Sequence, residues 1–546
     1  MIANIVTLLV SVVLYRPFWE ECDDVGMALL AEGAYGYNEP HLVYSNIING
    51  KVLCILQSLF AGIRWHAVIQ YLFIFIAAVS FTYILSKDVK GRILSVVFLA
   101  ATFYELYVSI QYSKVSTAVA IMSYMVLFGI VKQEMKGRER TVLAVVSICA
   151  LSYSHILRLE SFLLATMTAG VYGICLVIIL CIKGEFAKKI KSYVTLFAPV
   201  FVILIICYAV DHAAYSESGW NDFLSYNDSR VQMTDYHFNA LLYDLHGEEL
   251  SGLGVSENDA GMYITYQFAT DDLAPALMDK ISALDKKGLS YIDIDFMKAW
   301  IANIYNDVFV LNALVIALVS LAGVFVSASF ADERRRYLLS LFVTEAAVTL
   351  GVLFYYQYSC RWNHRIVFAL LFAVFTPLVY ELSDMDIPER MRGLWSAVTA
   401  LLLMCMIGSR LANEFDYQEY KRSAPHYEEL EQYMADNKDT VFVADTFTMI
   451  DIDKYKVFTT GPLGRHENLL YTGSALTTKS PVEEKILKKF GYDTPLDALA
   501  SRDDNVILVD NRSPWAKVWY CDEHGDGLYG LEEVVSVGGL DLYRIR

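Results

Sequence analysis

The sequence predicts a polytopic α-helical membrane protein that ends in a small α/β domain. Hydrophobic residues make up 55% of its 546 residues, and mean hydropathy is positive. Apolar runs long enough to cross a bilayer recur along most of the chain. The last part of the chain changes to a polar, mixed pattern. The net charge of −17 argues against nucleic acid as a partner, because a nucleic-acid surface needs clustered cations.

The apolar runs predict about eleven transmembrane helices, since a helix needs about 20 residues to cross the hydrocarbon core. The expected spans lie near residues 1–15, 65–85, 93–111, 117–131, 141–155, 159–182, 193–211, 307–330, 337–358, 365–381 and 394–411. The first run lacks a small-residue cleavage signal, so we expect a retained helix and not a signal peptide.

Basic residues predict the orientation of the spans. One set of short loops is rich in Lys and Arg, and the alternate short loops hold only one or two cations each. The rich loops contain Lys87, Lys90 and Arg92, Lys132, Lys136, Arg138 and Arg140, Lys183, Lys188, Lys189 and Lys191, Arg334, Arg335 and Arg336, and Arg390 and Arg392. Because basic loops stay in the cytoplasm, the amino terminus is expected inside the cell and the carboxyl terminus outside.

Three large segments are then expected on the exterior side. They are the first loop at 16–64, an insert at 212–306 that interrupts the bundle, and the tail at 412–546. The expected organisation is therefore a transmembrane bundle over 1–411, followed by a soluble extracytoplasmic domain.

The tail alternates strand-like and helix-like patterns, which indicates an α/β domain. Strands are expected at 440–444, 506–510 and 540–545, and helices at 426–436 and 481–490. The tail has no Walker loop and no dinucleotide-binding glycine motif, and none of its residues indicates catalysis.

The first exterior loop contains two adjacent aspartates, Asp23 and Asp24. They stand at the start of a predicted short helix over 24–32, which the glycines from Gly33 onward would end. A second helix is expected to begin near Pro40. On that helix His41 would head a polar stripe at four-residue spacing, which suits the membrane interface.

Each of these features also has an ordinary structural explanation. Aspartates at a helix start commonly cap it. Arg158 and Glu160 can pair with each other at a short turn, and the run 361–365 can anchor a membrane boundary through basic and aromatic side chains. The functional interpretation rests on convergence, because the predicted topology puts all these groups on the exterior side.

The chemistry of this set is asymmetric, with one acidic pair and several cations. The cations are Lys114, Arg158, Arg361 and Arg365, with His155 and His364 as further candidates. Sugar transfer from a phosphate-linked donor needs both kinds of group. A carboxylate accepts the proton of the attacking hydroxyl, and cations stabilise the departing phosphate. Alternatively, the two aspartates could hold a divalent cation such as Mg²⁺ or Mn²⁺.

These features resemble the GT-C membrane glycosyltransferases, in particular uncharacterised many-spanning members of Gram-positive bacteria. The matching strings are the acidic pair, Gly36-Tyr-Asn-Glu-Pro-His-Leu-Val-Tyr-Ser-Asn46, Arg158-Leu-Glu-Ser-Phe162, Trp220 with Tyr226-Asn227 and Arg230, and Arg361-Trp-Asn-His-Arg365. The resemblance implies that Asp23 or Asp24 is a general base and that the donor is a polyprenyl-phosphate or polyprenyl-diphosphate sugar. It also implies that the transfer takes place on the outer face of the membrane, with a lipid, protein or polysaccharide as the acceptor. Metal use varies in that family.

Two interpretations of the polar and aromatic residues in the insert are possible. Trp220 could stack on a sugar ring and Arg230 could bind hydroxyl groups, but we favour the alternative that these residues form the core of a folded loop.

Two other functions stay open. A polysaccharide polymerase or ligase would centre on the insert and its arginine, leaving Asp23 and Asp24 dispensable. A glycan transporter or flippase would place ionisable residues near the midplane of its helices, where the sequence offers mainly Glu105 and Glu345.

Overall fold

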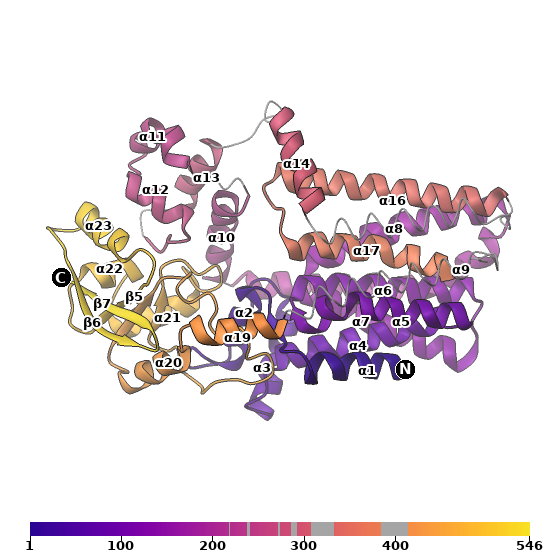
Figure 1. Ribbon diagram of the computed structural model, residues 1–546, viewed down its shortest axis with the longest axis horizontal. Helices are drawn as coiled ribbons and strands as arrows, with labels where there is room; N and C mark the ends of the chain where they lie inside the picture. Colours follow the sequence, from indigo (N-terminus) through magenta and orange to yellow (C-terminus); the bar gives the residue numbers. More distant parts are fainter. Residues whose placement is uncertain (218, 237–240, 271–272, 285–291, 307–331, 384–412) are drawn as a thin grey trace.

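The computed structural model describes residues 1–217, 219–236, 241–270, 273–284, 292–306, 332–383 and 413–546 (Figure 1). A bundle of long helices forms one end of the elongated molecule, and a domain built on a β-sheet forms the other. The helices α10 to α13 lie beside this sheet domain.

Eight of the described helices are long and apolar enough to cross a membrane, which confirms the polytopic helical class. They are α4 (Trp65–Leu85), α5 with the π-helical turn η1 (Val89–Val108), α6 (Tyr112–Lys132), α7 (Gly137–Leu157), α8 (Leu159–Ile182), α9 (Phe186–Tyr215), the Leu339–Tyr358 part of α16 (Asp332–Tyr358), and α17 (His364–Ser383). The most central of them is α6, which is buried along its whole length and is surrounded by α4, α7, α8 and α17.

Three of the eleven expected spans are not among these eight helices. The first corresponds to α1 (Ile2–Val13), whose 12 residues are fewer than the roughly 20 that a span requires. The spans expected at 307–330 and 394–411 lie outside the described residues.

The loop at 16–64, which is expected on the exterior side and keeps the name first exterior loop, contains α2 (Cys22–Glu32) and α3 (Ile47–Leu59). As expected, α2 carries the aspartates in its first turn, and Gly33 ends it with a left-handed φ of 81°. The expected helix near Pro40 is wrong, because Val43 takes a positive φ of 65° that no α-helix tolerates. Instead α3 begins at Ile47, and its N-cap Asn46 accepts the N–H of Ile48 through its side chain at 3.0 Å. His41 therefore heads no helical stripe.

The insert folds into short helices around a small apolar core of its own. These helices are α10 (Trp220–Thr234), α11 (Leu242–Gly252), α12 (Glu257–Ile264) and α13 (Pro275–Leu284). The last helix of the insert, α14 (Ile294–Asn306), contacts α16 instead, and the ring centroids of Phe296 and Phe354 lie 5.2 Å apart. Tyr226, Leu250 and Phe268 belong to this core, while Trp220 packs with the main core of the molecule.

The C-terminal part is built on a five-stranded mixed sheet, in agreement with the α/β pattern of the sequence. Its elements are α19 (Asn413–Ser423), α20 (Tyr427–Asp436), β3 (Val441–Ala444), β4 (Leu469–Tyr471), α21 (Pro481–Phe490), α22 (Pro495–Ala500), β5 (Val506–Val509), α23 (Pro514–His524), β6 (Leu531–Val537) and β7 (Leu540–Ile545). The strand order is β4-β3-β5-β7-β6, and β4, β3 and β5 run parallel. The three strands and two helices expected from the sequence are all present.

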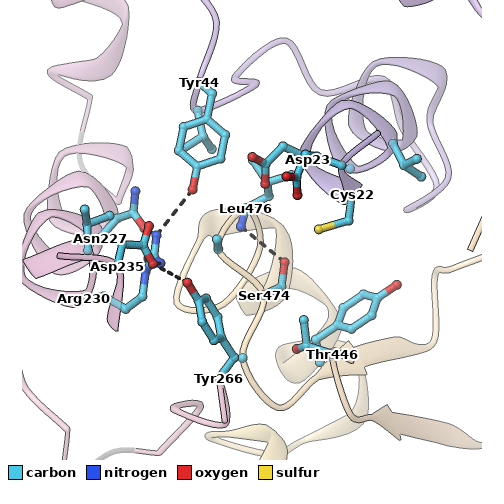
Figure 2. Close-up of a pocket in the computed structure, with 18 of the residues that line it drawn as sticks. Cys22, Asp23, Tyr44, Asn227, Arg230, Asp235, Tyr266, Thr446, Ser474 and Leu476 are labelled. Carbon is cyan, nitrogen blue, oxygen red and sulfur yellow. Dashed lines mark hydrogen bonds and ion pairs between the residues drawn. The ribbon is translucent and has the colours of Figure 1, made fainter. Parts of the chain in front are cut away.

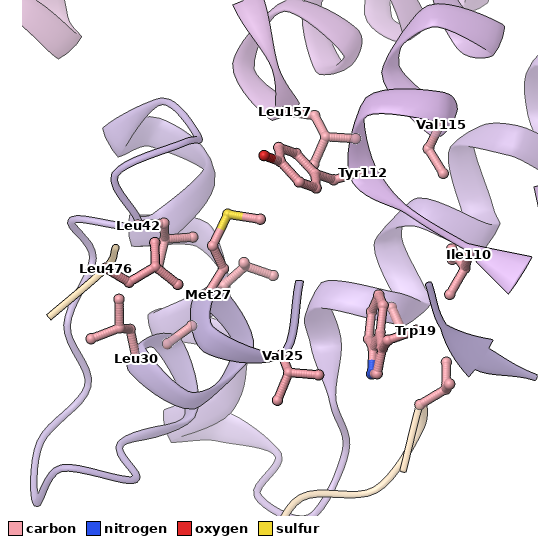
Figure 3. Close-up of a cluster of buried hydrophobic side chains, with 14 of the residues drawn as sticks. Trp19, Val25, Met27, Leu30, Leu42, Ile110, Tyr112, Val115, Leu157 and Leu476 are labelled. Carbon is pink, nitrogen blue, oxygen red and sulfur yellow. The ribbon is translucent and has the colours of Figure 1, made fainter. Parts of the chain in front are cut away.

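The C-terminal domain is joined to the first exterior loop by backbone contacts and a buried ionic network. The N–H of Gly464 donates to the carbonyl of Gly33 at 3.0 Å. Arg64 is 1% exposed and binds both Glu32 at 2.9 Å and Asp453 at 2.7 Å. Close to this network, Leu476 of the C-terminal domain lies among apolar side chains of the first loop (Figure 3). A second link, the parallel pairing of β1 (Phe18–Trp19) with β2 (Ser109–Ile110), ties that loop to the bundle.

Candidate functional site

A cavity of about 820 Å³ lies where the bundle, the insert and the C-terminal domain meet (Figure 2). Its lining comes from three parts of the molecule. The bundle wall includes Glu21, Asp23, Tyr44, Tyr112, Arg158, Glu160, Arg361 and Arg365; the insert wall includes Asn227, Asp228, Arg230, Asp235 and Tyr266; and the C-terminal wall includes Thr446, Phe447, Tyr471, Ser474 and Leu476.

The acidic side of the cavity is made by Asp23 and Glu21, which share one guanidinium group. Arg365, in the first turn of α17, lies 3.2 Å from Asp23 Oδ2 and 3.4 Å from Glu21 Oε2. Burial raises the pKa of Glu21, and the charge of Asp23 adds to this effect while Arg365 opposes it. The cavity therefore brings two carboxylates and a cation together.

Asp24 points away from this cavity, because successive residues of a helix face directions about 100° apart. Its side chain is fully buried; Oδ1 lies 3.0 Å from His66 Nε2, and Oδ2 accepts the N–H of Tyr112 at 3.2 Å. Burial raises the pKa of Asp24, against the lowering effect of these partners. The two neighbouring carboxylates therefore have different surroundings, with Asp23 in the cavity and Asp24 in the protein interior.

Four arginines line the cavity, and each is held by a carboxylate or an aromatic ring. Arg158 lies over the Tyr44 ring at 5.0 Å from its centroid and pairs with Glu160 at 2.8 Å. Arg230 is 1% exposed and binds Asp235 at 3.1 Å. Arg230 also donates to Asn227, Thr234 and Tyr44, so its five N–H donors are directed to protein partners. Arg158 donates to Glu160 and to the carbonyl of Tyr44, which leaves N–H donors for a further anion.

Asp235 connects the arginines of the insert and the bundle. Its carboxylate pairs with Arg230 through Oδ1 and with Arg361 through Oδ2 at 3.2 Å, and it accepts the hydroxyl of Tyr266. Although burial raises the pKa of Asp235, these partners lower it below its usual value. Sequence alone does not single out Asp235 in this role, because two of its partners, Tyr266 and Arg361, are distant in the chain.

Four of the expected substrate-binding residues do not line the cavity: His41, Lys114, Trp220 and His364. Lys114 is fully buried and pairs with Glu105 at 2.9 Å and with Glu20. His364 lies 3.2 Å from the same Glu105. The rings of His41 and Trp220 stack on each other with centroids 4.5 Å apart.

The contacts of these four residues explain their places without a substrate. The interpretation of Trp220 as a core residue agrees with its 5% exposure. The remaining expected residues, Asp23, Arg158, Glu160, Arg230, Arg361 and Arg365, all line the cavity.

Sequence reasoning missed the C-terminal wall entirely. Thr446 and Ser474 follow β3 and β4, and the carboxyl ends of parallel strands are a common place for ligands. That rule was the available signal. The residues themselves carry no charge and match no catalytic motif.

One group of side chains in the described part of the chain has metal-ligand spacing. Ligand atoms of Asp259, Glu523 and His524 lie within 4.8 Å of one another, between α12 and α23. They do not line the cavity. His524 Nε2 lies 3.0 Å from Asp259 Oδ1, and Glu523 accepts the hydroxyl of Ser256 at 2.7 Å. These contacts explain the cluster without a metal ion.

No protein-family model matches the sequence, and no curated protein is similar to it in sequence. Among solved structures, the chain is similar to ArnT from Cupriavidus metallidurans bound to undecaprenyl phosphate, with 10% identity, coverage of 99% of this chain and 96% of that chain, and a TM-score of 0.39. It is also similar to the archaeal oligosaccharyltransferase AglB from Archaeoglobus fulgidus, in complex with an inhibitory peptide and a dolichol-phosphate. There the identity is 11%, the coverage 95% and 71%, and the TM-score 0.38. At these scores the likeness carries no conclusion about activity.

Proposed function

We propose that the protein is a membrane glycosyltransferase that moves a sugar from a polyprenyl-phosphate-linked donor to a cell-envelope acceptor on the outer face of the membrane. One observation carries the proposal. A single cavity at the end of the bundle holds Asp23 together with Arg158, Arg230, Arg361 and Arg365. These are the groups that such a transfer needs, a proton acceptor and a set of cations for a phosphate.

In the proposed reaction, an acceptor hydroxyl attacks the anomeric carbon of the donor sugar. Asp23 takes the hydroxyl proton as the new carbon–oxygen bond forms. The bond between the anomeric carbon and the phosphate oxygen breaks, and its electron pair stays on the phosphate. The arginine side chains stabilise the charge that develops there. Asp23 is preferred over Asp24 because only Asp23 lines the cavity.

The place of the cationic groups suits a donor that arrives from the bilayer. Arg365 is in the first turn of α17, and Arg158 is the residue that precedes α8. Both helices are candidate membrane spans. A phosphate at these helix ends would therefore leave its polyprenyl chain beside apolar helix surface.

The test is Asp23→Asn in the full-length protein, with incorporation of labelled sugar into envelope glycans as the measurement. We expect a loss of about 10²–10⁴-fold, the usual contribution of a general base. Asp222→Asn is the matched control, since Asp222 is also an acid in the first turn of a helix but is exposed and outside the cavity. It should transfer sugar normally.

Wild-type transfer by Asp23→Asn at normal protein levels would remove the proposed base. If Arg230→Ala then abolished incorporation, a polymerase or ligase centred on the insert would explain the activity better.

A further inference from the structure

The C-terminal wall of the cavity differs in chemistry from the other two walls. Its residues are Thr446, Phe447, Met449, Ile450, Ile452, Tyr471, Gly473, Ser474, Ala475 and Leu476, none of which is charged. The bundle and insert walls contain the four arginines and several carboxylates. Charge is therefore concentrated on one side of the cavity, and hydroxyl, aromatic and aliphatic groups on the other.

We propose that the C-terminal wall is the acceptor subsite and that it binds a neutral sugar ring. This inference rests on the proposed function, which assigns the donor phosphate to the arginines. An anion gains more beside guanidinium groups than beside uncharged hydroxyl groups, because hydrogen bonds between ionised partners are stronger. A sugar ring has apolar faces and a rim of hydroxyl groups. The wall offers partners for both, with Tyr471 for the faces and Thr446 and Ser474 for the rim. The Phe447 ring supports this wall and is itself packed against Arg512 and Tyr266.

The hydroxyl groups of Ser474 and Thr446 can each form a further hydrogen bond to a ligand, for different reasons. Ser474 Oγ accepts the N–H of Leu476 at 3.3 Å and that of Thr477 at 3.2 Å. Its own proton can then be donated to a sugar oxygen. Thr446 Oγ1 is buried and has no hydrogen-bond partner within the described residues. Rotation about the Cα–Cβ bond would turn this hydroxyl toward the cavity that Thr446 lines.

The loop that carries Ser474 is held firmly between the insert and the sheet. Thr472 donates its N–H to the carbonyl of Ala444 and accepts the N–H of Ala269, both at 2.9 Å. The N–H of Ser474 donates to Thr478 Oγ1 at 2.7 Å. A loop fixed in this way can bind a ring in one orientation with little loss of conformational freedom.

The same loop touches the helix that carries the proposed base. Leu476 packs against α2 so closely that a Cβ at Gly26 would lie 2.2 Å from its Cδ1. Gly26 is three residues after Asp23, and residues at that spacing share one helix face. The loop therefore places Ser474 beside the same face of α2 as Asp23, where an acceptor hydroxyl has to lie.

The experiment measures binding of neutral methyl glycosides of glucose, galactose, mannose and N-acetylglucosamine to the full-length protein in lipid nanodiscs by saturation-transfer NMR. We expect at least one of them to bind. Ser474→Ala should raise the Kd about three-fold to ten-fold, the effect of losing one hydrogen bond. Ser480→Ala is the matched control, because Ser480 Oγ also accepts two backbone N–H groups in the same domain but lies outside the cavity. It should bind normally.

Absence of binding by all four glycosides, an unchanged Kd in Ser474→Ala, or an equal loss in Ser480→Ala would overturn the subsite. Tighter binding of glucose 1-phosphate than of methyl glucoside, with the same sensitivity to Ser474→Ala, would place a phosphate at this wall and would also overturn it. A failure of the proposed function would appear separately, as normal sugar transfer by Asp23→Asn.

Discussion

At the scale of single residues, the division between Asp23 and Asp24 shows how helix geometry gives neighbours different roles. Asp23 faces Arg365 in the cavity, whereas Asp24 binds His66 and the backbone of Tyr112 in the protein interior. The sequence correctly placed both at a helix start. It could not show which one faces the cavity, since that depends on how α2 is rotated against α4 and α6.

Glu483 is a buried acid outside the cavity whose ionisation should set a pH dependence of stability. It is 2% exposed; Oε2 accepts the N–H of Lys479 at 2.7 Å, and Oε1 has no hydrogen-bond partner within the described residues. Burial raises the pKa of Glu483 to about 8, from an ordinary value of 4.5. The folded state thus binds more protons than the unfolded state between these two values, so stability should fall as pH rises through that window.

Glu483→Gln should remove this dependence, because the amide does not ionise. The apparent Tm in nanodiscs is expected to rise by about 5 °C or more at pH 8 and to change little at pH 4.5. Glu484→Gln, at an exposed neighbouring position of α21, serves as control. A Tm of Glu483→Gln that stays parallel to the wild type from pH 4.5 to pH 8 would contradict the predicted ionisation.

At the scale of elements, helices and strands were predicted correctly where a local sequence pattern determines the structure. The regular strands β3, β5 and β7 and the helices α20 and α21 follow from alternation, helical spacing and capping residues, and all are present. The helix expected from Pro40 failed because the chain turns at Val43, and no local pattern marks a positive φ at a valine. The C-terminal wall of the cavity was missed because it arises only when β3 and β4 meet α2 and the insert.

The loop that carries Ser474 packs so closely against the insert at Gly473 that no side chain should fit at this position. A Cβ at Gly473 would lie 1.7 Å from the carbonyl oxygen of Tyr266, so backbone would have to move. Gly473→Ala should therefore lower sugar transfer at least about ten-fold by opening the cavity wall. At Gly26 the added Cβ meets the flexible end of Leu476, and Gly26→Ala should have a smaller effect. Transfer rates of the two purified variants test this order, and equal rates would contradict it.

At the scale of the whole molecule, the buried ionic network joins the C-terminal domain to the first exterior loop. Arg64→Met would leave Glu32 and Asp453 buried without one of their main partners. A cost of about 3–5 kcal/mol is usual for this kind of change. Lys298→Met removes an exposed pair with Asp295 and should cost almost nothing. Thermal unfolding of both variants in nanodiscs measures the difference, and similar midpoints would show that the network contributes little.

The orientation in the membrane is a prediction at the same scale. The basic loops between the spans put the cavity and the C-terminal domain outside the cell. Alkaline phosphatase fused after Arg546 should be active, and green fluorescent protein at the same site should stay dark. Fluorescence from the second fusion would reverse the orientation, and the donor and acceptor would then have to be cytoplasmic.

The assembly of the cavity from distant parts of the chain also affects when the protein can act. Its bundle wall begins at Glu21, but its last wall is completed by Leu476. A chain still being synthesised thus carries the proposed base in the membrane for most of its production without a finished cavity. Under the proposed function, newly made protein would not consume a lipid-linked sugar until the C-terminal domain has folded against α2. Activity is in this way tied to completion of the chain.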